Sequence, residues 1–180
     1  MKFFSGLLLG MLCILTAHAE EMMNHAQHMA ATTSDSRELL NYPPDVRIHA
    51  LANMRRHLQT LSEIMDAFAN GKYAEAADIA DSRLGMDSSG AAGCRPDTMK
   101  MKMSMKMTPM TEADHLNHEM ALLMPEKMRE LGQNMHKSAN DFAAKAREAE
   151  KDSKQIKNAE IALAKIPQHC VACHEVFRMQ

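Results

Sequence analysis

Residues 156–177 read IKNAEIALAKIPQHCVACHEVF, and this stretch combines a helical repeat with a cysteine motif. Its apolar side chains recur at steps of three and four residues, which places them on one face of a helix. These side chains are Ile156, Ala159, Leu163, Ile166, Cys170, Cys173 and Phe177. Pro167 removes one helical hydrogen bond, so we expect a kink just before the cysteines. The stretch predicts an amphipathic helix whose buried face includes both cysteines.

Three further segments predict helices in the same way. The first follows Pro43 and Pro44, ends at Asn70-Gly71, and carries a stripe of Leu51, Met54, Leu58, Leu61, Met65 and Phe68. The second runs from about Tyr73 to Gly85, and the third opens at Pro125 with Met128, Leu131, Met135, Ser138 and Phe142 in register. Four amphipathic helices with mostly short links predict an all-α, antiparallel four-helix bundle.

Residues 86–122 interrupt this pattern. They contain glycines, prolines and the low-complexity run TMKMKMSMKMTPM at 98–110. We therefore expect a long Met-rich loop or insertion between the second and third helices.

The composition excludes several other classes. Aromatic residues make up 4% of the chain and there is no Trp, which argues against a β-sandwich or β-barrel. A net charge of −2 lacks the basic footprint of a nucleic-acid-binding protein.

The N-terminus predicts export. Residues 1–19, MKFFSGLLLGMLCILTAHA, combine a positive start, an apolar run too short to span a bilayer, and a small-residue cleavage site. Cleavage between Ala19 and Glu20 would release a periplasmic protein with no stable membrane span. Residues 20–42 then form a mobile extension containing Met and His, and residues 43–180 form the helical domain.

The sequence Cys170-Val171-Ala172-Cys173-His174 is the C-x-x-C-H attachment signal of c-type haem. Two thiols add to the two vinyl groups of haem, and the adjacent His174 ligates the iron on the proximal side. The same residues are also compatible with a disulfide, a thiol redox centre, or burial in the core. A zinc site with Cys94 and His115 or His118 is a further alternative, although its spacing is irregular.

With this motif close to the C-terminus of a helical bundle, the chain resembles the class II c-type cytochromes, the cytochrome c′ family and its low-spin relatives. The matching features are the exported precursor, Asn70-Gly71-Lys72-Tyr73 after the first helix, and the terminal CVACHEVFR. The resemblance covers about 44–84 and 124–180. It implies thioether bonds from Cys170 and Cys173 and proximal ligation by His174. Relatives often form a homodimer through their first two helices, and the sequence leaves open whether this chain does.

The resemblance also implies that the distal side of the iron faces the first helix. Met54, on its apolar stripe, is the candidate sixth ligand, and a thioether there would raise the reduction potential. Met128 and Met135 are weaker candidates. An inward Met is also a common core filler, and Leu51 and Leu58 would then cap a five-coordinate iron. His49 and His57 fall off the stripe and are expected in solvent.

Two Met/His clusters suggest a second metal. They comprise Met22, Met23, His25, His28 and Met29 in the extension, and Met99, Met101, Met103, Met105 and Met107 in the loop. Thioethers prefer Cu(I), so copper binding is one hypothesis. A low-complexity tract with oxidisable Met is the alternative.

These observations favour a single-electron carrier that exchanges electrons with redox partner proteins and is not an enzyme. A five-coordinate gas-binding haem protein is the first alternative. A copper-binding or copper-trafficking protein is the second.

Overall fold

The computed structural model describes residues 35–96 and 111–179. Residues 37–180 form one compact unit, which contains all the helices and strands discussed below. The predicted signal peptide, most of the predicted extension and the Met-rich run at 98–110 lie outside the described residues. Every candidate copper ligand named above also lies outside the described residues.

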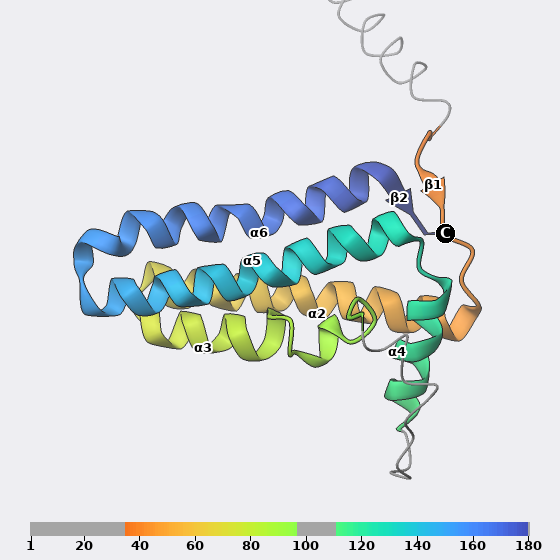
Figure 1. Cartoon of the computed structure of the whole chain (residues 1–180), viewed down its shortest axis with the longest axis horizontal. Coiled ribbons are helices and arrows are strands. Elements are labelled where there is room, and N and C mark those ends of the chain that lie inside the picture. Colours follow the sequence, from red (N-terminus) through yellow and green to blue (C-terminus); the bar gives the residue numbers. More distant parts are fainter. Residues whose placement is uncertain (1–34, 97–110, 180) are drawn as a thin grey trace, which may run out of the picture. The chain divides into compact units, whose positions relative to one another are not determined.

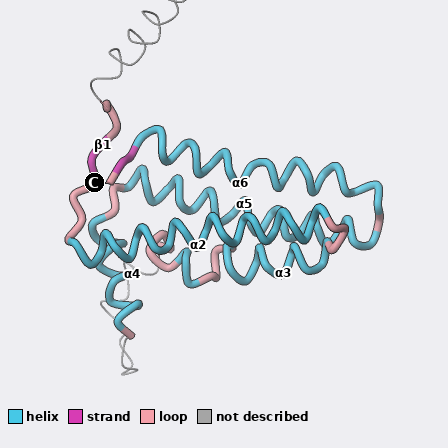
Figure 2. The backbone as a smooth tube through the Cα atoms, turned by 180° about the vertical axis from the view of Figure 1, so that it is seen from behind, coloured by secondary structure: helices cyan, strands magenta, loops and turns pink. Residues whose placement is uncertain are grey.

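The described chain is all-α, as predicted, apart from two strands of two residues each. The helices are α2 (Pro44–Ala69), α3 (Tyr73–Leu84), α4 (Glu112–Leu123), α5 (Glu126–Lys151) and α6 (Ile156–Val176). Short 3₁₀ turns occur at η1 (Ser89–Ala91) and η3 (Ser153–Gln155), and the strands are β1 (Glu38–Leu39) and β2 (Phe177–Arg178). Figure 1 shows α2, α3, α5 and α6 lying alongside one another, and Figure 2 shows the same arrangement from behind. In this arrangement α5 packs against both α3 and α6, and α2 packs against α3.

The ends of α2 follow the chemistry expected from the sequence. Pro44 occupies the first turn, where a missing N–H costs nothing, and Asp45 lies at the positive end of the helix dipole. At the other end Gly71 adopts a φ of 72°, a left-handed conformation that suits glycine. The Lys72 N–H then donates to the Ala67 carbonyl at 2.9 Å and closes the helix.

The predicted apolar stripe of α2 is wrong in part. Leu51, Leu58 and Met65 are 36%, 70% and 53% exposed, although Leu61 is buried. The buried face of α2 is instead made by Val46, Ala50, Asn53, Thr60, Leu61, Ile64 and Ala67. The partner helix α3 buries three alanines, Ala76, Ala77 and Ala80. Small residues allow two helices to approach closely, so the face of α2 with small side chains is the one that packs.

The prediction of a loop across 86–122 is also wrong for its last third, because α4 begins at Glu112. The side chain of Thr111 accepts the Asp114 N–H, and the Asp114 carboxylate accepts the Thr111 N–H at 3.1 Å. This capping box satisfies two N–H groups that would otherwise lack partners. Met120 and Ala121 are buried, so one side of the short helix packs on the protein.

The apolar interior is divided into two clusters along the helices. One cluster centres on Ile64, Leu84, Phe142 and Ile166, and the half-buried Cys170 packs against it. The other contains Leu40, Val46, Cys94, Met120, Met124, Met128 and Phe177, and both Met54 and Cys173 pack against it. The two cysteines of the C-x-x-C motif therefore contact different parts of the core.

Candidate functional site

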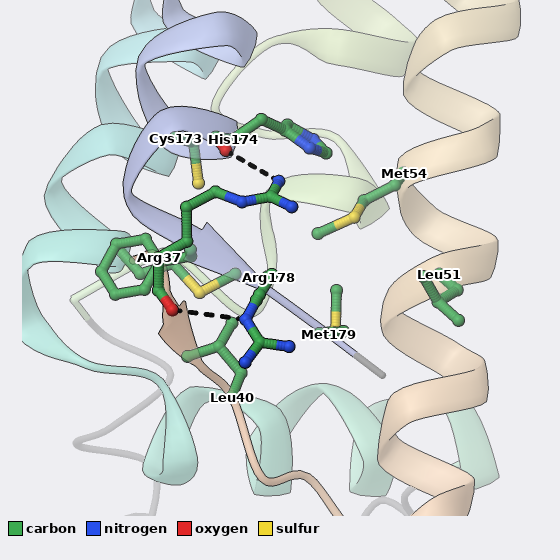
Figure 3. A pocket seen from close by; sticks show the side chains of 10 residues that line it. Arg37, Leu40, Leu51, Met54, Cys173, His174, Arg178 and Met179 are labelled. Atoms are coloured by element: carbon green, nitrogen blue, oxygen red, sulfur yellow. Dashed lines mark hydrogen bonds between the residues drawn. The ribbon is translucent and has the colours of Figure 1, made fainter. Parts of the chain in front are cut away.

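A cavity of about 200 Å³ lies beside the C-terminal end of α6 (Figure 3). Its walls come from α2, α5, α6 and the two strand segments. The lining residues are Arg37, Leu40, Leu51, Met54, Met128, Cys173, His174, Phe177, Arg178 and Met179. Three residues singled out from the sequence, Met54, Cys173 and His174, thus share one cavity.

The two helices that carry these residues reach the cavity from different sides. Figure 3 shows the Met54 side chain extending from α2 into the space that also faces His174. His174 is exposed, and its imidazole makes no hydrogen bond to another described residue. Its backbone carbonyl accepts a hydrogen bond from the Arg37 guanidinium at 3.2 Å. The imidazole nitrogens are therefore available to a ligand.

The thiols of the motif are free and half-buried. Burial raises the pKa of both Cys170 and Cys173, so both are protonated at neutral pH. Cys170 is not a lining residue. Its Sγ lies 3.6 Å from the Ile166 carbonyl oxygen, within the same helix. Protonated thiols are poor nucleophiles in disulfide exchange, which limits competing oxidation of the pair.

Cys94, the third cysteine among the described residues, belongs to the segment after α3 and is buried against α5. Burial, with a contribution from Cys173, raises its pKa to about 11. A side chain at Gly132 of α5 would collide with the Cys94 sulfur, so the two residues are closely packed. Cys94 thus packs as an apolar core residue of the cluster that also contacts the cavity.

The other methionine candidates are placed differently from Met54. Met128 lines the cavity, and the Tyr42 hydroxyl donates to its sulfur at 3.6 Å. Met135 is buried in the cluster around Phe142 and does not line the cavity. Leu51 is a lining residue and Leu58 is not. Of the three methionines proposed from the sequence, Met54 and Met128 therefore share the cavity with Cys173 and His174, and Met179 is a further lining methionine.

His57 and His136 have buried surroundings that the predicted helical stripes did not indicate. His57, expected in solvent, packs edge-on against His136 with the ring centroids 5.2 Å apart. The His136 Nδ1–H donates to the Leu84 carbonyl at 2.8 Å. Burial, then His136, then Arg56 lower the pKa of His57 to about 4. His49 also has a partner, because its Nε2 lies 2.8 Å from the Asn117 Oδ1. A signal was present, since His136, Ala139 and Ala143 recur at helical spacing and share a buried face of α5.

No helix in 35–96 or 111–179 combines the length and apolar character of a membrane span. Within the same ranges, no group of three or more His, Cys, Asp or Glu side chains is placed to hold a metal ion. Compared with known proteins, the chain matches no family model, no curated protein and no solved structure.

Proposed function

We propose that this chain is a periplasmic class II c-type cytochrome that transfers single electrons. In this proposal α2, α3, α5 and α6 form an antiparallel four-helix bundle. Haem c is attached through Cys170 and Cys173, with His174 as proximal ligand and Met54 as distal ligand. The observation that carries the proposal is the meeting of Met54, Cys173 and His174 at one cavity.

The donor set of the cavity suits haem. A haem iron has four porphyrin nitrogens, so the protein needs to supply only axial ligands and not a cage of three or more side chains. An imidazole and a thioether are a known axial pair in cytochromes c. The motif also supplies free thiols for covalent attachment.

The walls of the cavity suit a large apolar ring. Leu40, Leu51, Phe177 and the methionines give it an apolar lining. Its volume of about 200 Å³ is below the roughly 300–1,000 Å³ of most small-molecule sites. A porphyrin therefore requires the methionine side chains to change rotamer, which their unbranched, flexible stems allow.

When bound, the haem supplies an iron that alternates between the ferric and ferrous states. The residues of the chain hold and tune it. His174 and Met54 would hold the iron, and the apolar side chains around them would exclude water and so favour the less charged ferrous state. A thioether ligand raises the potential further.

The gas-binding alternative rests on Leu51, which lines the cavity one helical turn before Met54. If Met54 serves only as core filler, Leu51 caps an open iron position. The absorption spectrum of the purified ferric protein separates the two. A weak far-red band indicates a low-spin, thioether-ligated haem, whereas high-spin features with rapid CO binding indicate an open site. The copper hypothesis stays a separate proposal, tested by copper titration of the wild type against a deletion of Met99–Met110.

A further inference from the structure

Residues 86–95, here called the η1 segment, follow α3 and pack on the helices. The η1 turn within the segment contacts α2, α3 and α5. The Met86 N–H donates to the Asn140 Oδ1 at 2.9 Å, and the Gln133 side chain donates to the Cys94 carbonyl at 2.8 Å. These two hydrogen bonds tie the segment to α5 near both of its ends. In this arrangement Cys94 is buried, with 8% of its surface exposed.

The middle of the segment closes over a histidine of α2. A side chain at Gly90 would collide with the His57 Nε2, so the bare backbone of the segment covers this nitrogen. The His57 Nε2 is buried and has no hydrogen-bond partner among the described residues. The same is true of the Ser88 Oγ in the segment and of the Asn53 Nδ2, one helical turn before His57. Buried polar atoms without partners destabilise a packed arrangement, so the segment closes here against an opposing free energy.

A positive charge on His57 would oppose this closure further. The imidazolium has an N–H on each ring nitrogen, and the buried Nε2 position offers it neither water nor an acceptor. The groups that act on its charge are His136 of α5, whose ring centroid lies 5.2 Å away, and Arg56 of its own helix. Both disfavour the positive form of His57.

Neighbouring groups on the other elements give the charge no compensation. From α3, the Leu84 carbonyl already accepts the Nδ1–H of His136. From the η1 segment, Ser88 and Gly90 are not titratable, and the acidic Asp87 is exposed. A positive His57 is therefore best stabilised by water, which reaches the Nε2 only when the segment moves away.

We propose that His57 is a pH-dependent latch: its neutral ring allows the η1 segment to lie on α2 and α5, and its protonation releases the segment and exposes the Cys94 thiol. The latch lies outside the cavity, because His57, Gly90 and Cys94 are not among the lining residues. It therefore does not rest on the proposed function.

Amide hydrogen exchange of the η1 segment, measured on the full-length protein and corrected for the intrinsic effect of pH on exchange, tests the latch. The pKa of His57 is about 4 in the closed form and near 6.5 in water, so segment opening should increase about twentyfold between pH 7 and pH 5. His57→Gln should lose this dependence. The matched control His115→Gln, at an exposed position of α4, should behave as the wild type. Equal increases in the wild type and in His57→Gln would overturn the latch.

The same experiment separates release of the segment from unfolding of the whole protein. Local opening requires the η1 segment to be less protected than residues 159–166 of α6 at both pH values. Local opening also exposes little surface, so dilute urea should accelerate exchange in α6 much more than in the segment. Equal protection and equal urea dependence in the two regions would show that the segment opens only on global unfolding, and the latch would be wrong.

The Gly90→Ala variant tests the contact without a change of pH, because the added methyl group would collide with the His57 Nε2 and displace the segment. The reagent 4,4′-dithiodipyridine reacts with thiols below neutral pH, and peptide mass spectrometry reports its reaction with Cys94. Rates are divided by those of the urea-unfolded chain at the same pH.

In the wild type, this normalised rate should rise about twentyfold from pH 7 to pH 5. In Gly90→Ala, the Cys94 thiol should already react rapidly at pH 7. A wild-type thiol that is equally protected at both pH values, or a Gly90→Ala protein that protects Cys94 as well as the wild type does, would overturn the proposal.

Discussion

Met54 of α2 and His174 of α6 are far apart in the sequence and line the same cavity. In Figure 3 the Met54 thioether extends into the space that faces His174, with Cys173 beside them. Axial ligation of a haem iron requires two donors that reach one site from different sides, and the proposed function assigns these two roles to Met54 and His174. Met54 is therefore the most informative position for mutation.

Replacing Met54 with Ala should convert the ferric spectrum from low spin to high spin, because the alanine side chain has no donor atom. The loss of the far-red band and a gain of CO binding by the ferrous protein would be measured by absorption spectroscopy. Met135→Ala is the matched control, since Met135 is buried but does not line the cavity. A low-spin spectrum that persists in Met54→Ala would eliminate Met54 as the ligand.

Replacing Cys173 with Ala should abolish correct haem loading, because only one thiol is left to form a thioether. Haem staining of the denatured polypeptide measures the covalent bond. Cys94→Ala is the control, because Cys94 packs in the core outside the motif. It should keep its haem, at a stability cost on the order of 1 kcal/mol for the lost apolar group. Loss of covalent haem from Cys94→Ala, with retention in Cys173→Ala, would contradict the assignment of the motif.

The sequence predicted the helices well where local chemistry sets their ends. Proline at the start of α2, Gly71 after it and Pro125 before α5 each act within a turn or so of their own position. The buried face of α2 was harder, because hydrophobicity alone selects Leu58 and Met65. Packing selects smaller residues: Ala67 shares a core cluster with the alanines of α3, and Ala50 is buried in the second cluster.

In the site, too, only the features set by local sequence were predictable. The C-x-x-C-H motif is local, so Cys170, Cys173 and His174 could be proposed from the sequence, and the structure brings Cys173 and His174 of these to the cavity. The place of Arg37 at the cavity could not be predicted, because Arg37 directly precedes β1, and the pairing of β1 with β2 joins two segments far apart in the sequence through only two residues each. The His57–His136 contact likewise joins two helices, and periodicity within either helix does not reveal a contact between them.

The exposed and buried leucines of α2 give a direct test of the corrected packing. Leu61 is 8% exposed and Leu58 is 70% exposed, and both belong to the stripe predicted from the sequence. Leu61→Ala should lower the free energy of unfolding by about 2–5 kcal/mol, and Leu58→Ala by less than about 0.5 kcal/mol. Urea denaturation measures both. A loss at Leu58 as large as that at Leu61 would show that this face of α2 is covered.

The buried His57 should make stability depend on pH. Its pKa is about 4 in the folded protein and near 6.5 when unfolded, so the unfolded chain binds more protons between these values. Stability is therefore complete above pH 6.5 and falls as the pH drops toward 4, by about 3 kcal/mol in total. Burial lowers the pKa of His136 as well, which acts in the same direction.

Urea denaturation at pH 7 and pH 5 measures this dependence. The wild type should lose about 2 kcal/mol over the interval through His57 alone. His57→Gln should lose correspondingly less, because the titrating group is gone. His115→Gln, at an exposed position of α4, should behave as the wild type. Equal losses in the wild type and His57→Gln would rule out His57 as the source.

Mass spectrometry of the mature protein tests the central claim most directly. The protein should be produced in a host with active haem-attachment machinery and purified from the periplasm. The account predicts a red protein whose chain starts at Glu20 and carries one haem, with the adduct on the peptide that contains Cys170 and Cys173. A colourless protein with both thiols unmodified would contradict it.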